Sequence, residues 1–139
     1  MINKIVSEIQ QLLEGYLKRH TEIAVAYIFG SVAQGRSNVL SDIDFGIIVD
    51  KNKIEEHIYP YGYKAHILSD LMKLLKTNKL DLVILNNAPP LLRHRVLYYG
   101  KLIHSIDEKR RIRFQVETIN KYNDYKYIHK AHAVTHIAS

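Results

Sequence analysis

The chain has 139 residues and a mass of 16.2 kDa, with 47% hydrophobic and 24% charged residues and no cysteine. These values fit one globular domain over residues 1–139 and exclude a disordered tail, a collagen-like fibre, a disulfide scaffold and a cysteine-ligated zinc site. Twenty Lys and Arg against fourteen Asp and Glu give a formal charge of +6, which indicates an anionic partner without identifying it.

A membrane segment is not expected. No apolar run approaches the roughly 18 residues that cross a bilayer. The first ten residues carry Lys4 and Glu8, where a signal peptide needs a continuous apolar stretch. We therefore expect a cytoplasmic protein with no membrane partner.

The first half of the chain predicts a helix followed by two strands. Apolar residues recur at helical spacing over residues 2–17, which indicates an amphipathic helix. Residues 23–29 form a short apolar, β-branched run that is typical of a buried strand, and a glycine turn at Gly30 follows. After a polar loop over residues 34–41, residues 42–49 resemble a second strand that is acidic where it begins.

The second half continues the alternation of helices and strands. Residues 51–62 are ambiguous, and Leu68, Leu71, Met72 and Leu75 then restore a helical stripe. A third strand is expected over residues 79–85. A helix over residues 91–99 should follow, with two prolines at its start and Gly100 at its end.

The chain should end with a short strand and a long helix. The strand is expected to end near Ile103. Ser105 and Glu108 have the spacing of a capping box, and Ile112, Val116 and Ile119 lie on one face of a final amphipathic helix that runs to about Tyr127. The fold class is therefore α/β (α+β): a small mixed sheet flanked by helices.

Two acidic residues mark the beginning of the second strand. Asp42 and Asp44 are two positions apart, so an extended backbone directs both carboxylates to the same face. Two adjacent like charges are favourable when a cation neutralises them, and oxygen ligands of this kind suit magnesium bound together with phosphates. The alternative is a pair of solvated acids at a strand end.

The glycine turn after the first strand is a candidate phosphate site. Gly30 lets the backbone approach an anion, Ser31 adds a hydroxyl donor, and the start of a helix offers free N–H groups. Gly35 and Arg36 could contribute in the same way, or could be ordinary loop residues. An ordinary tight turn is the alternative interpretation of Gly30.

Asp81 is a third acidic candidate. It stands in the otherwise apolar run Leu80 to Leu85, where an ionised carboxylate is costly unless it lies at the strand end, is paired or binds a metal. The sequence alone leaves open whether it is a ligand or a strand-edge residue facing solvent.

Together these residues resemble a known superfamily. Gly30-Ser31, ten intervening residues and then Asp42-Ile43-Asp44, with Asp81 on a later strand, are similar to the signature of the nucleotidyltransferases that include DNA polymerase β. The chain length and residues 81–89 and 96–100 resemble more narrowly the minimal nucleotidyltransferases of the MntA-type adenylyltransferase antitoxins, which are encoded beside HEPN toxins.

The resemblance implies a function and roles for these residues. It implies transfer of AMP from ATP to a tyrosine of a cognate HEPN RNase toxin, which silences the toxin in a hetero-oligomer. Asp42, Asp44 and Asp81 would be the catalytic residues and would bind two Mg²⁺ ions, and Gly30 and Ser31 would bind the nucleotide. Stable nucleic-acid binding is not expected.

Other polar groups have competing interpretations. The basic cluster Lys109, Arg110, Arg111 and Arg113 could steer an anionic partner, or could be a solvated helix start. The C-terminal His129, His132 and His136 have helical spacing, but a solvated or partner-facing tail explains them better than a metal site. Tyr122, Tyr125 and Tyr127 could be interface or modification residues, although packing explains Tyr122 as easily.

Two other functions keep the same catalytic residues or the same partner. One is a nucleotidyltransferase acting on a small hydroxylated substrate of the aminoglycoside kind, or on an RNA 3′ end. The other is a non-catalytic antitoxin that works by binding. The chain is short for an additional acceptor-binding domain, which favours a partner protein as the acceptor.

Overall fold

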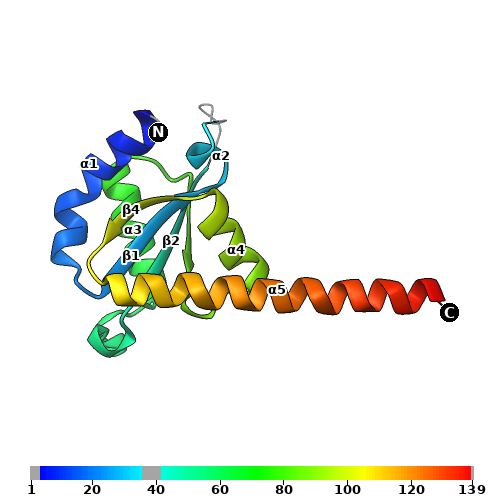
Figure 1. The fold of residues 1–139 in the computed structure, drawn as a ribbon. Helices are drawn as coiled ribbons and strands as arrows, with labels where there is room; N and C mark the ends of the chain where they lie inside the picture. The colour runs from blue at the N-terminus through cyan, green and yellow to red at the C-terminus, as the bar shows by residue number, and fades with distance from the viewer. Residues whose placement is uncertain (1–3, 36–41, 139) are drawn as a thin grey trace.

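The computed structural model describes residues 4–35 and 42–138, and the side chains within these ranges apart from residues 129 and 131–138. The described elements alternate as the sequence predicts (Figure 1). In chain order they are α1 (Lys4–Arg19), β1 (Ile23–Phe29), α2 (Gly30–Ala33), β2 (Ile43–Val49), the 3₁₀ turns η1 (Lys51–Lys53) and η2 (Glu56–Ile58), α3 (Tyr63–Leu75), β3 (Leu80–Ile84), the 3₁₀ turn η3 (Leu85–Asn87), α4 (Pro90–Tyr99), β4 (Lys101–Ser105) and α5 (Glu108–Ala138).

The four strands form one mixed sheet in the order β3-β2-β1-β4. β1 lies in the middle and pairs antiparallel with both β2 and β4, whereas β2 pairs parallel with β3. The expected class, a small mixed sheet flanked by helices, is confirmed. Because β2 and β3 are parallel, their N-terminal ends lie at the same edge of the sheet.

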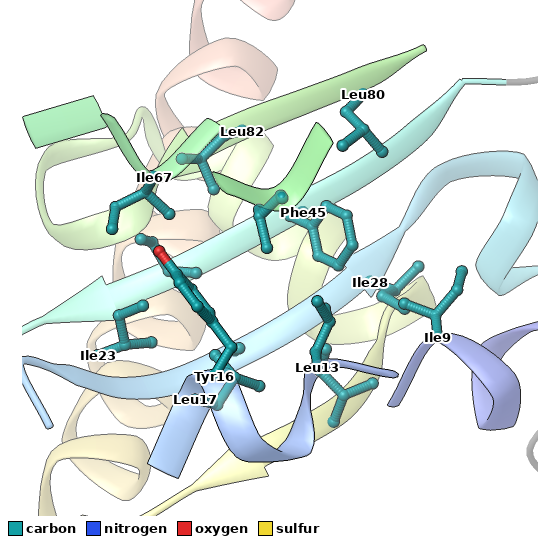
Figure 2. Packing of buried hydrophobic residues seen from close by; sticks show 14 of the residues in the cluster. Ile9, Leu13, Tyr16, Leu17, Ile23, Ile28, Phe45, Ile67, Leu80 and Leu82 are labelled. Carbon is teal, nitrogen blue, oxygen red and sulfur yellow. The ribbon is translucent and has the colours of Figure 1, made fainter. Parts of the chain in front are cut away.

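Side chains from both faces of the sheet are buried in two clusters. Figure 2 shows the larger one, in which α1 side chains such as Leu13 and Tyr16 pack toward Phe45 of β2 and Leu82 of β3. Ile67 of α3 belongs to the same cluster, so α1 and α3 cover this face. Val6, Ile9, Leu13, Tyr16 and Leu17 of α1 are buried as their spacing predicts, whereas Ile5 and Leu12 of the same predicted stripe are 45% and 58% exposed.

The opposite face carries a smaller cluster under α4 and α5. Val96 of α4 and Phe114 of α5 pack against Tyr27 and Ile48 of the sheet. The guanidinium carbon of Arg93 lies 4.6 Å from the centre of the Phe114 ring, and Arg93 is almost completely buried. A cation over an aromatic face retains favourable electrostatics when it is desolvated. Arg93 therefore joins α4 to α5.

The long helix α5 differs from its prediction in three respects. It continues to Ala138, well beyond Tyr127. Its cap is Asp107, whose Oδ1 accepts a hydrogen bond from the backbone N–H of Arg110 at 3.1 Å, and not Ser105. The capping box is therefore wrong, although the Ser105 hydroxyl donates to a Glu108 carboxylate oxygen at 2.9 Å.

The third difference concerns which face of α5 packs. Ile112, Val116 and Ile119 share one face as predicted, but they are 50%, 51% and 43% exposed. Among the described side chains of this helix, Phe114 and Thr118 are the buried ones. The apolar residues at helical spacing therefore lie on the outer face of α5. The inner face packs through Phe114 and Thr118.

Ion pairs within the chain explain part of the basic cluster. Arg110 pairs with Asp107 at 3.5 Å and with Asp50 at 3.8 Å, and Arg111 pairs with Glu108.

Tyr122 stacks on His94 of α4 with ring centres 3.5 Å apart, which favours packing as its role. No helix within the described residues is both apolar enough and long enough to span a bilayer.

Candidate active site

The sheet register brings two of the three predicted acidic residues side by side. Asp44 of β2 pairs with Asp81 of β3 in the parallel ladder, and with Phe29 of β1 on its other side. In-register neighbours in a sheet direct their side chains to the same face. Asp44 and Asp81 therefore share the face that α4 and α5 cover further along the sheet, at the end where Asp81 is exposed.

Asp42 lies directly before β2 and is exposed. Its charge acts on Asp44: the pKa of the Asp44 carboxyl is raised from its ordinary value by burial first, then by the negative charge of Asp81 and then by that of Asp42. Like charges disfavour one another's ionised form when they are close. The three predicted carboxylates thus form one electrostatic cluster, with Asp44 at its half-buried centre.

Gly30 contributes to this cluster in a way that the sequence did not reveal. Its backbone is left-handed, with φ at +78°, and a Cβ atom added there would collide with a carboxylate oxygen of Asp44. The absence of a side chain leaves the space in which the Asp44 carboxylate lies. No local pattern carries this signal, because it depends on the pairing of Phe29 with Asp44 in the sheet.

Ser31 is half-buried and follows Gly30 in the single turn of α2. The turn is closed by the N–H of Gln34, which donates to the carbonyl of Gly30 at 3.2 Å. Ser31 therefore stands next to the acidic edge of the sheet. Arg36, the other candidate of this loop, lies outside the described residues.

The donor set suits a hard divalent cation. Carboxylate oxygens are the ligands that Mg²⁺ prefers, and burial followed by the negative charges of Asp81 and Asp42 raises the pKa of Asp44, which a bound cation would counteract. Among the side chains that the structure describes, no three of His, Cys, Asp or Glu are already gathered as a metal cage. A cation would therefore have to draw the aspartates together. The side chains of His129, His132 and His136 lie outside the described part of the chain.

A comparison with known protein families matches the part of the chain that contains these residues. The family model described as "Polymerase beta, Nucleotidyltransferase" matches residues 11–109, which include all three aspartates, Gly30 and Ser31. The chain belongs to this family. The match covers α1 from its middle, the whole sheet and helices α2 to α4, and leaves most of α5 outside.

Individual relatives share nearly the full length. The "Protein adenylyltransferase MntA" of Aphanizomenon flos-aquae is 27% identical over 128 residues, which cover 90% of this chain and 85% of that protein. A chain from a toxin–antitoxin crystal structure with AMP-PNP is similar in fold, with a TM-score of 0.71 and 22% identity over 94% of this chain and 98% of that one.

A second similar structure contains a modified partner. It is a complex of a tri-AMPylated HEPN toxin from Shewanella oneidensis with an MNT antitoxin, and the match has a TM-score of 0.62 and 21% identity. It covers 94% of this chain and 99% of the matched one. At these identities the similarity establishes the fold, α5 included, because almost the whole chain is aligned.

Proposed function

We propose that this nucleotidyltransferase is a protein adenylyltransferase that acts as an antitoxin. It transfers AMP from ATP to a tyrosine hydroxyl of a cognate HEPN toxin and remains bound to that toxin in a hetero-oligomer. The observation that carries the proposal is the pairing of Asp44 with Asp81 beside Gly30, whose missing side chain makes room for the Asp44 carboxylate. The relatives named above supply the acceptor class.

In this proposal each site residue has a distinct role. Asp42, Asp44 and Asp81 would hold two Mg²⁺ ions, and Gly30 and Ser31 would bind the phosphates of ATP. Bound magnesium would neutralise the triphosphate and the charge that develops on it during transfer. The raised pKa of Asp44 supports this assignment, because the same cations would relieve the repulsion among the carboxylates.

The transfer itself is a substitution at the α-phosphorus of ATP. The tyrosine oxygen forms a bond to this phosphorus in line with the bond that breaks, which joins it to the bridging oxygen of the β-phosphate, and pyrophosphate leaves. A tyrosine hydroxyl has an ordinary pKa of about 10, so its proton must be removed as the bond forms. Asp81 is exposed at the edge of the site and accepts this proton in the proposal.

The fold leaves the acceptor to a partner. All four strands and the helices α1 to α4 are used to build and cover the sheet, and the aspartates stand at its open end. A second protein can present a tyrosine to that end.

The test is AMP transfer from α-labelled ATP to the cognate HEPN toxin. We expect labelled toxin with the wild-type chain and Mg²⁺. The rate of AMP transfer should fall at least about 100-fold with Asp44→Asn, because this variant lacks one carboxylate that would hold the metal ions at the developing charge. The matched control is Glu14→Gln, which neutralises a side chain that is 63% exposed on α1 and should transfer normally.

The outcomes separate the alternatives. Label retained by Asp44→Asn would contradict the site. Toxin that is neutralised but unlabelled by the wild-type chain would indicate an antitoxin that acts by binding alone. Label on an aminoglycoside or an RNA end, with none on the toxin, would indicate a different acceptor for the same centre.

A further inference from the structure

The outer face of α5 carries an apolar stripe that nothing in the described chain covers. Ile112, Val116 and Ile119 follow one another at i, i+4 and i+7, and each is 43% to 51% exposed. Successive helical positions are 100° apart, so these three fall within about 60° of one another. Phe114 and Thr118, which face the sheet side, lie more than 120° away from the centre of this stripe.

A helix packed on only one side does not need such a stripe. The seat of α5 is already provided by Phe114, by Arg93 over its ring and by the stacking of Tyr122 on His94. Aligned exposed aliphatic side chains are typical of a surface that another helix or groove covers, and single scattered ones are not. The spacing i, i+4, i+7 is that of the anchor residues of a helix that docks on a partner.

The charge of α5 decides between possible occupants. The helix holds seven Lys and Arg residues against three Asp and Glu. Arg110 and Arg111 are used in ion pairs within the chain, while Lys109 and Arg113 are exposed beside the stripe. A second copy of this chain would place one basic stripe on another, which like-charge repulsion disfavours. The complementary surface is apolar in its centre and acidic at its rim.

The stripe is separate from the acidic edge of the sheet. α5 begins just after Ser105, which pairs with Val25 near the start of β1, whereas Asp44 pairs with Phe29 at its end. Four residues of strand separate the two positions, a distance of roughly 13 Å. The stripe also faces away from the side of α5 that carries the buried Phe114 and Thr118, so contacts at the stripe add binding energy without involving the aspartates.

We propose that the stripe Ile112, Val116 and Ile119, with its basic flank Lys109 and Arg113, is the surface on which the acceptor protein docks through an acid-rimmed amphipathic helical face. This inference rests on the proposed function for the identity of the acceptor, the cognate HEPN toxin. It assigns to α5 the affinity for the toxin, and leaves the chemistry to the aspartates.

The experiment compares the double variant Ile112→Asp/Val116→Asp with the control Leu12→Asp, which places one such charge at an aliphatic residue 58% exposed on α1. Binding to a toxin whose acceptor tyrosine is replaced by phenylalanine is measured by calorimetry without ATP, and AMP transfer to the natural toxin is measured separately. All the altered side chains are exposed, so circular dichroism should show the helix content unchanged.

We expect the double variant to bind at least about 10-fold more weakly and to show a correspondingly higher KM for toxin, with kcat at saturating toxin unchanged. Leu12→Asp should match the wild-type chain in both. Lys109→Glu/Arg113→Glu should weaken binding most at low salt.

Three results would overturn the inference: wild-type affinity in the double variant, a fall in kcat with no change in KM, or a wild-type dimer in solution that the double variant abolishes. Failure of the proposed function has a different signature, which is absence of AMP transfer by the wild-type chain whatever its affinity for the toxin.

Discussion

The two faces of the sheet are built for different purposes. One face packs α1 and α3 over the larger cluster, which includes Leu13, Phe45 and Ile67 (Figure 2). The other packs α4 and α5 over a smaller cluster and also carries Asp44 and Asp81 at its open end. Alternate residues of the same strand therefore serve stability on one side and the acidic site on the other.

The separation of the apolar face from the acidic face explains how the fold accommodates repulsion among the carboxylates. A group of carboxylates lowers the stability of the folded chain, and the apolar face must compensate for it. The consecutive residues Asp44 and Phe45 illustrate the division most clearly, because they project to opposite faces of β2. Substitutions on the two faces should therefore differ in sign as well as in size.

The largest expected effect is on the apolar face. Phe45 is 2% exposed and fills the centre of the larger cluster, so Phe45→Ala should lower the free energy of unfolding by about 3–5 kcal/mol through lost burial and the cavity that remains. Urea unfolding followed by circular dichroism measures this. A decrease below about 1 kcal/mol in the free energy of unfolding would contradict the assignment of stability to the apolar face.

The next effect is expected at Gly30, where a substitution should affect both stability and AMP transfer. Gly30→Ala should cost roughly 1–2 kcal/mol for the left-handed backbone and should also abolish AMP transfer, because the new Cβ meets the Asp44 carboxylate. Gly35 provides a matched control, since its φ is +73° but a Cβ there meets nothing within 4 Å. Gly35→Ala should carry the backbone cost alone. Equal transfer by the two variants would remove the role assigned to Gly30.

An effect on stability alone is expected where β2 ends. The Asn86 side chain pairs with the backbone of Val49 like an additional strand residue: its oxygen accepts from the Val49 N–H at 3.0 Å, and its amide donates to the Val49 carbonyl at 2.8 Å. Asn86→Ala removes both bonds and should lower the free energy of unfolding by about 1–3 kcal/mol. Thermal unfolding by calorimetry tests this, and an unchanged melting temperature would contradict it.

Much of this architecture could be predicted from local patterns. The runs at residues 23–29 and 42–49 show strand composition, and the spacing around Leu13 shows a helix face, because each pattern reports burial on one element. The acidic pair and Asp81 were found as candidates, and their roles as ligands stay a prediction. Their pairing depends on the parallel register of β2 and β3, which no local pattern contains.

The orientation of α5 could not be predicted for a related reason. Periodicity identifies an apolar face but not what covers it, and the stripe at Ile112 is a stronger signal than the inner face with Phe114 and Thr118. The role of Gly30 likewise depends on which residue its strand neighbour presents, which is a tertiary contact between β1 and β2.

The smallest effect on stability should have the opposite sign. The pKa of Asp44 is raised, so the folded chain binds this proton more tightly than the unfolded chain does, and the associated stability is lost as the pH rises from the unfolded value of about 3.9 through the raised folded value. Asp44→Asn carries no such proton. Without metal its melting temperature should therefore be slightly higher than that of the wild-type chain at neutral pH, and this advantage should vanish near pH 4.

Magnesium should raise the melting temperature of the wild-type chain more than that of the variant, since only the wild-type chain has the full ligand set. A metal-free variant less stable than the wild-type chain at pH 7 would mean that Asp44 contributes to the fold and not only to the site.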